Sequence, residues 1–117
     1  MRKKTPANQS QNSNILIYDV EETFVQCLDI LKRKNHDYAG KDTPDPYKNF
    51  KNVNVVGVNV EKGILVRIMD KITRISNLTE HEAQVKDESI QDTLSDLINY
   101  SAILKSYLKN KNGKATK

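Results

Sequence analysis

The sequence predicts an all-α protein, a small helical bundle that we expect to be completed across a homodimer. Three segments repeat apolar side chains every three or four residues, which is the spacing of the buried face of a helix. The chain has 117 residues, which is room for one small domain. Only 37% of them are hydrophobic and 6% aromatic, so the core is lean and a second copy would help to cover it.

The chain divides into one central domain and two polar ends. Residues 1–14 begin with three basic residues and have no apolar side chain from Asn8 to Asn14. Because this stretch has nothing to bury, we predict that residues 1–14 form a disordered polar tail. Residues 15–108 form the single all-α domain, which contains a long loop at 35–59. Residues 109–117 are predicted to be a disordered basic tail.

The three helices are located by their apolar stripes. The first is expected over residues 19–34, with acidic residues near its start, where the helix dipole favours them. The second is expected over 61–78 and the third over 88–109, with Asp87 as its cap. The stripes that place them are Val20, Phe24, Cys27, Leu28 and Leu31, then Ile64, Ile68, Ile72 and Ile75, then Ile90, Leu94, Leu97, Ser101, Leu104 and Leu108.

The 35–59 loop is too long to be an idle connection, and glycines and prolines punctuate it. Its aromatic residues could stack on a nucleotide base and its lysines could attract phosphates. The nucleotide-binding residues expected here are Tyr38, Lys41, Lys48 and Phe50. The alternative is that the aromatic side chains pin the loop to the helices. Val53, Val55 and Val58 could form a short extended piece.

The acidic face of the third helix is the sharpest chemical signal. Glu88, Asp92 and Asp96 share one sector of the helix, opposite its leucine stripe. Carboxylates one turn apart can hold Mg²⁺ that bridges to a nucleotide, although a solvated acidic face is the commoner origin of such a pattern. The same sector continues into Ile103, with Tyr100 at its border. This face is therefore expected to meet a neighbouring helix, where a cation or a basic residue would offset the repulsion between carboxylates.

The second helix offers charges of both signs. Asp70 could be a fourth metal carboxylate, and Arg67, Lys71 and Arg74 could bind phosphate oxygens. The alternative is that Asp70 and Arg74, four residues apart, form only a surface ion pair.

Charge and apolar patterning limit the partners. The formal charge of +4 is too small, and its basic residues too terminal, to indicate nucleic acid. No apolar run approaches the length of a membrane span, so no membrane partner is expected. The single cysteine, Cys27, lies on an apolar stripe and is predicted to be a core residue in a reducing compartment. We expect a cytoplasmic protein of a bacterium or a phage-infected host.

Four runs of sequence, residues 34–40, 47–50, 66–74 and 87–100, resemble a family of small phage and bacterial proteins described as nucleotide-modification-associated. More distantly, the third helix is similar to MazG-type all-α nucleoside triphosphate pyrophosphohydrolases. In those enzymes acidic residues of two neighbouring helices hold Mg²⁺, and the protein works as a dimer or tetramer. The MazG pattern pairs Glu-x-x-Glu on one helix with Glu-x-x-Asp on the next. Only the second motif has a counterpart here, as Glu88, Asp92 and Asp96 at altered spacing.

These observations predict a protein that binds nucleotides and hydrolyses them with Mg²⁺, in the manner of a nucleoside triphosphate pyrophosphohydrolase. Loss of the first acidic motif affects hydrolysis more than binding. The alternative is a non-catalytic phage binder that sequesters a nucleotide signal or blocks a host defence protein. A third reading is a helical module that binds protein only.

Overall fold

The computed structural model describes residues 9–39, 47–81 and 89–111, and within them every regular element is a helix. The elements are α1 (Gln9–Ala39), α2 (Lys48–Lys51), the 3₁₀ helix η1 (Asn52–Val56), α3 (Val60–Leu78) and α4 (Ile90–Lys111). The all-α prediction is confirmed. None of the helices in the described ranges is long and apolar enough to cross a membrane.

Helix α1 is longer than predicted at both ends. It begins at Gln9, inside the stretch that we predicted to be disordered, and continues to Ala39, inside the predicted loop. From Gln9 to Ala39 the chain contains neither glycine nor proline. Once the apolar middle of the helix has formed, each further residue adds a hydrogen bond at little cost, so the helix spreads into polar sequence. Residues 1–8 and 112–117 lie outside the described ranges, and the disordered tails there stay predictions.

Helices α3 and α4 lie close to their predicted positions because both have clear stripes and caps. Asn59 caps α3, its Oδ1 accepting a hydrogen bond from the backbone N–H of Lys62 at 2.9 Å. Ser89 does the same for α4, accepting from the N–H of Asp92 at 3.1 Å. Asp87, the predicted cap, lies outside the described residues.

The valine-rich segment before α3 is helical, so the extended piece suggested for Val53 to Val58 is wrong. Val53 lies in η1, which Gly57 ends with a φ of 79°, in the left-handed region that favours glycine. A Cβ on Gly63 of α3 would lie 2.9 Å from Val53 Cγ2. The glycine therefore lets η1 lie directly against the start of α3.

The core lies between α3 and α4, where α2 closes one end. Phe50, Val60 and Ile64 are buried there. Partly buried side chains pack around them: Ile68, Tyr100, Ile103, Leu104 and Tyr107. The ring of Phe50 meets that of Tyr100 edge to face, with centroids 6.3 Å apart. Short α2 is thus fastened to the longer helices by its aromatic residue.

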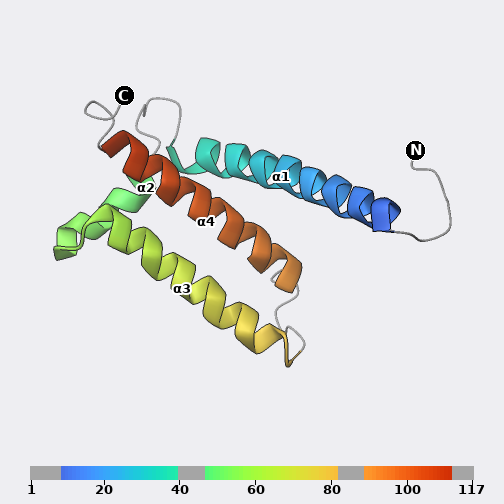
Figure 1. Cartoon of the computed structure of the whole chain (residues 1–117). Helices are drawn as coiled ribbons and strands as arrows, with labels where there is room; N and C mark the ends of the chain where they lie inside the picture. The colour runs from blue at the N-terminus through green and yellow to red at the C-terminus, as the bar shows by residue number, and fades with distance from the viewer. Residues whose placement is uncertain (1–8, 40–46, 82–88, 112–117) are drawn as a thin grey trace.

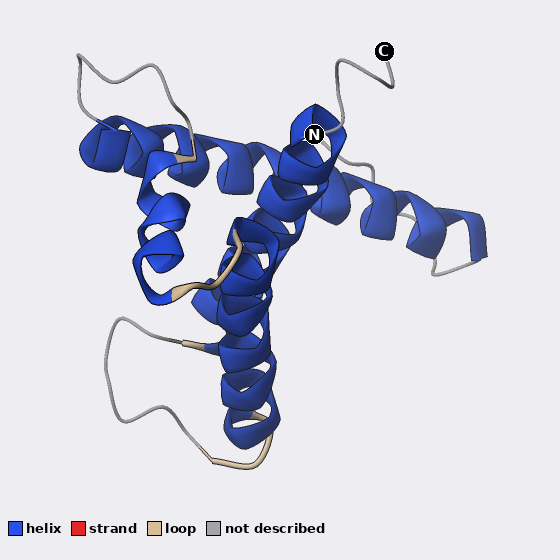
Figure 2. Ribbon diagram, turned by 90° about the vertical axis from the view of Figure 1, so that its left-hand side faces the viewer, coloured by secondary structure: helices blue, strands red, loops and turns tan. Residues whose placement is uncertain are grey.

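Helix α4 lies between α1 and α3 (Figure 1). Figure 2 shows α1 running across the α3–α4 pair rather than along it. Of the apolar stripe that predicted α1, only Cys27 is buried, with 2% of its surface exposed, whereas Phe24 is 58% exposed and Leu28 50%. The burial of Cys27 agrees with its predicted place in the core.

Candidate functional site

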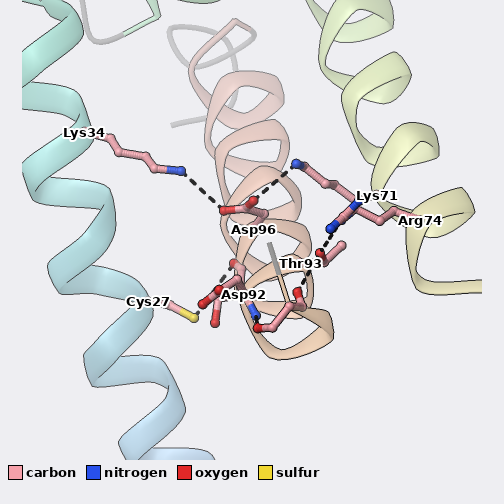
Figure 3. Close-up of polar contacts among 9 residues, drawn as sticks. Cys27, Lys34, Lys71, Arg74, Asp92, Thr93 and Asp96 are labelled. Carbon is pink, nitrogen blue, oxygen red and sulfur yellow. Dashed lines mark hydrogen bonds and ion pairs between the residues drawn. The ribbon is translucent and has the colours of Figure 1, made fainter. Parts of the chain in front are cut away.

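One carboxylate of α4 joins three helices. Asp96 Oδ1 lies 3.3 Å from Lys34 Nζ of α1, and Asp96 Oδ2 lies 3.2 Å from Lys71 Nζ of α3. Figure 3 shows the two lysines reaching the carboxylate from opposite sides. The acidic face of α4 therefore meets its neighbours at Asp96, and basic side chains provide the compensating charge that the sequence led us to expect.

The ion pairs at Asp96 are only partly shielded from water. The side chain of Asp96 is 24% exposed, that of Lys71 27% and that of Lys34 49%. Pairs of this exposure are screened by solvent and typically contribute less than about 1 kcal/mol each to stability. Two ammonium groups share one carboxylate, which leaves a surplus of positive charge at this position.

A buried threonine brings an arginine to the same face of α4. Thr93 is 2% exposed and lies one turn before Asp96. Its hydroxyl donates to the carbonyl of Ser89 at 2.9 Å and accepts from Arg74 Nε at 3.2 Å. Arg74 and Lys71 both belong to α3, so their side chains enter this region together (Figure 3). We call Lys34, Lys71 and Arg74 the cation cluster.

Helix α1 contacts α4 through polar groups near the cation cluster. Asn99 Nδ2 donates to the carbonyl of Cys27 at 3.0 Å. The thiol of Cys27 lies 3.9 Å from the carbonyl of Ser95, a weak sulfur hydrogen bond. These two contacts and the Lys34–Asp96 pair fix the position at which α1 crosses α4, and so hold Lys34 opposite α3.

Arg67 takes a different environment from the cation cluster. Its guanidinium carbon lies 5.1 Å from the centroid of the Phe50 ring and 5.9 Å from that of Tyr100. Both distances are in the range of cation–π attraction. Phe50 itself is 9% exposed and belongs to the core cluster. Phe50 therefore fits the alternative in which an aromatic side chain of the 35–59 segment pins that segment to the helices.

The predicted carboxylates are not gathered into one group. Asp70 and Asp92 are both exposed, and Asp96 is paired with lysines. Across 9–39, 47–81 and 89–111, no three His, Cys, Asp or Glu side chains are grouped so that they could hold a metal ion. Glu88 lies outside these ranges, so a site built on all four carboxylates stays a prediction. At Asp96 the donor set fits a lysine-neutralised carboxylate and does not fit Mg²⁺.

The remaining predicted residues are dispersed. Lys48 is exposed on α2. Tyr38 lies near the end of α1, with its side chain outside the described set, and Lys41 lies outside it entirely. Sequence reasoning missed Lys34 and Thr93. A signal for each was present: Lys34 is seven residues after Cys27, two helical turns along the face that is buried, and Thr93 is seven residues before Tyr100.

Comparison with known families found one similarity, which covers α3 and most of α4. Residues 61–105 are similar to the family described as "Nucleotide modification associated domain 1". This confirms the first resemblance seen in the sequence, whereas the more distant similarity to MazG-type enzymes is not confirmed. The matched segment covers α3 from its second residue and most of α4, and so includes Lys71, Arg74 and Asp96. No curated protein and no solved structure matched the chain.

Proposed function

We propose that the protein binds a nucleotide by its phosphates at the cation cluster, since residues 61–105 are similar to a nucleotide-modification-associated domain. The observation that carries the proposal is the convergence of Lys34 and Lys71, from two different helices, on the single carboxylate of Asp96. Arg74 adds a third positive charge one turn away on α3.

The charge balance of the cluster favours a polyanion. Two lysines face one partly buried carboxylate, Arg74 is bonded to Thr93 one turn before it, and the neighbouring Asp92 is exposed to solvent. Phosphate oxygens accept charge-assisted hydrogen bonds from lysine and arginine, and the planar guanidinium of arginine can engage two oxygens at once. A ligand with several phosphates would therefore gain more from this cluster than a ligand with one.

Tyr38, Lys41 and Lys48 stay the predicted contacts of the base, with Tyr38 as the stacking ring. Phe50 and Arg67 support these contacts indirectly, because Arg67 and the rings of Phe50 and Tyr100 hold α2 against α3 and α4.

Hydrolysis with Mg²⁺, expected from the MazG resemblance, stays a prediction that requires Glu88, Asp70 and Asp92. The binding function also suits a phage protein that sequesters a nucleotide signal in the cytoplasm of its host. Blocking of a host defence protein is a further alternative, which does not require the cation cluster.

The test is a panel of nucleosides and their mono-, di- and triphosphates, scored by thermal stabilisation and by chromatography for products. We expect stabilisation that grows with phosphate number. Lys71→Met and Arg74→Met should reduce it most for triphosphates, whereas Lys105→Met, at an exposed position on α4, is the matched control. Equal stabilisation by a nucleoside and its triphosphate, or equal losses in the control, would contradict the proposal.

We also propose that the protein is a homodimer that uses α1. Large apolar side chains of this helix are left exposed: Leu16, Ile17, Tyr18, Val20, Phe24, Val25 and Leu28. A monomeric soluble protein rarely exposes so continuous an apolar surface. The radius of gyration is 17.8 Å, against about 13 Å for a compact chain of this length. The same helix of a second copy would cover this face, because in a two-fold symmetric dimer the same apolar surface of both copies comes together.

A further inference from the structure

The resemblance to metal-dependent enzymes assigns Asp96 to a metal ion, yet its surroundings already supply positive charge. Each carboxylate oxygen faces a different lysine, Oδ1 at 3.3 Å from Lys34 Nζ and Oδ2 at 3.2 Å from Lys71 Nζ. Mg²⁺ binds carboxylate oxygens at about 2.0 to 2.1 Å and needs near-octahedral space around it. An ion at that distance from either oxygen would lie beside two ammonium groups, which repel it.

The other acidic residues of this region do not restore the balance in favour of a metal. Asp92, one turn before Asp96, is exposed, and so is Asp70 of α3. Asp70 is followed by Lys71, and Arg74 is bonded to Thr93 on the same side of α4. Among the described residues, two ammonium groups therefore face the single carboxylate of Asp96 where it meets α1 and α3.

We infer that Lys34 and Lys71 replace a divalent cation at Asp96, so that this carboxylate does not bind metal and the cation cluster binds nucleotide phosphate without Mg²⁺. The second half of the inference rests on the proposed function. Asp96 is then a competitor of the phosphates, because it pairs with the same two ammonium groups that would bind them.

Because of this competition, the two mechanisms predict opposite effects of Asp96→Asn on nucleotide affinity. If a metal bridged Asp96 to the phosphates, Asp96→Asn would weaken nucleotide binding. If the lysines bind phosphate directly, Asp96→Asn removes the competing charge and should strengthen ATP binding several-fold. Asp92→Asn is the matched control and should change the affinity less, because Asp92 lies one turn away and has no lysine partner in the part of the chain that the structure describes.

The experiment measures ATP affinity by calorimetry, once with EDTA and once with excess MgCl₂, for the wild-type protein, Asp96→Asn and Asp92→Asn. We expect wild-type affinities that agree within about twofold in the two buffers, and tighter binding by Asp96→Asn in both. A requirement for Mg²⁺, or weaker binding by Asp96→Asn in a sample whose circular dichroism matches the wild type, would overturn the inference. If Asp96→Asn lowers the helical content, Lys34→Gln with Lys71→Gln replaces it, and this pair should lose ATP binding in EDTA; retained binding would overturn the inference.

A second measurement uses Mn²⁺ alone and separates this inference from the proposed function. Titration of the wild-type protein with MnCl₂, followed by electron paramagnetic resonance, should show no binding that depends on Asp96. Saturable binding that Asp96→Asn removes would overturn the inference. Should ATP not bind in any buffer, the proposed function fails, and the Mn²⁺ titration by itself decides whether Asp96 is a metal ligand.

Discussion

The α3–α4 pair and α1 are joined to the molecule by different chemistry. Between α3 and α4 lies the apolar cluster of Phe50, Val60 and Ile64, in which Ile64 has no exposed surface. Helix α1 meets α4 through the ion pair of Lys34 with Asp96, the side-chain amide of Asn99 and the thiol of Cys27. Most of its large apolar side chains are exposed. Hydrophobic burial scales with area, whereas exposed ion pairs contribute little. The α3–α4 pair should therefore supply most of the stability, and α1 should depend more on the second copy that we propose to cover it.

The largest expected effect is in the α3–α4 core. Ile64→Ala removes a fully buried side chain and should lower the free energy of unfolding by about 2–5 kcal/mol, measured by urea denaturation. Leu28→Ala on α1, where the side chain is 50% exposed, is the comparison, made at a concentration low enough to keep the protein monomeric. Equal losses would show that α1 shares the core and would break the contrast between the two regions.

The next effect concerns the free face of α1. Phe24→Glu should weaken the homodimer at least about tenfold, because a carboxylate buried in an apolar interface loses its water without gaining a partner. Sedimentation over a range of concentrations measures this, with Arg33→Glu as a control that adds a carboxylate to an exposed position of the same helix. A wild-type protein that stays monomeric at high concentration would remove α1 from the proposed interface.

A smaller effect is expected where α2 is fastened to the pair. Arg67→Ala should lower the free energy of unfolding by about 1–2 kcal/mol, through lost cation–π attraction to Phe50 and Tyr100 and lost packing of the side-chain stem. Arg67→Met keeps much of the stem and should recover part of the loss. If both variants match the wild type in denaturant midpoint, the guanidinium does not hold α2.

The smallest effect is expected where Glu61, in the first turn of α3, forms an ion pair with Lys111, in the last turn of α4. The hydrogen bond from Lys111 lowers the pKa of Glu61 below 4.5, and the same bond raises the pKa of Lys111 above 10.5. A lowered carboxyl pKa stabilises the fold at neutral pH, and this contribution is lost as pH falls through the folded pKa. The contribution of Lys111 is lost only as pH rises through its own raised pKa.

Glu61→Gln tests this pair through the pH dependence of the melting temperature. The variant should melt slightly below the wild type at neutral pH and converge with it in acid, once Glu61 of the wild type is protonated. Because water reaches both side chains, that of Lys111 being 44% exposed and that of Glu61 20%, the difference should shrink in high salt. A gap that persists in acid would mean that the carboxylate contributes by packing and not by charge.

The sequence was sufficient for the elements whose stripes are buried. The isoleucine stripe of residues 61–78 placed α3 within one residue of its observed start, and the leucine stripe placed α4 within two. The stripe of α1 also predicted a helix, but could not tell that most of its apolar face would be exposed within one copy, because amphipathicity does not identify the covering surface. The valines of η1 were misread because their local pattern does not show that Val53 packs against Gly63 of α3.

The candidate site was predictable in part for the same reason. Periodicity put Asp96, Lys71 and Arg74 on helix faces of suitable charge, and the structure brings them close together. It could not supply the crossing point of α1, which decides that Lys34 completes the cluster. Nor could it choose between stacking and packing for Phe50, since an aromatic residue among lysines suits both until its neighbours are known.

Because Gly63 and Val53 are in close contact, substitutions at these two positions are expected to occur together in related chains. A side chain at position 63 would meet the Val53 methyl groups at 2.9 and 3.2 Å, so close that the Val53 side chain or η1 would have to shift. Related chains that carry alanine at position 63 should therefore carry a residue smaller than valine, such as alanine or glycine, at position 53. The two substitutions would be tolerated together and harmful separately, which is the non-additivity expected of residues in contact. A search for relatives can use this pair as a signature of the bend before α3, even where the rest of that segment has diverged.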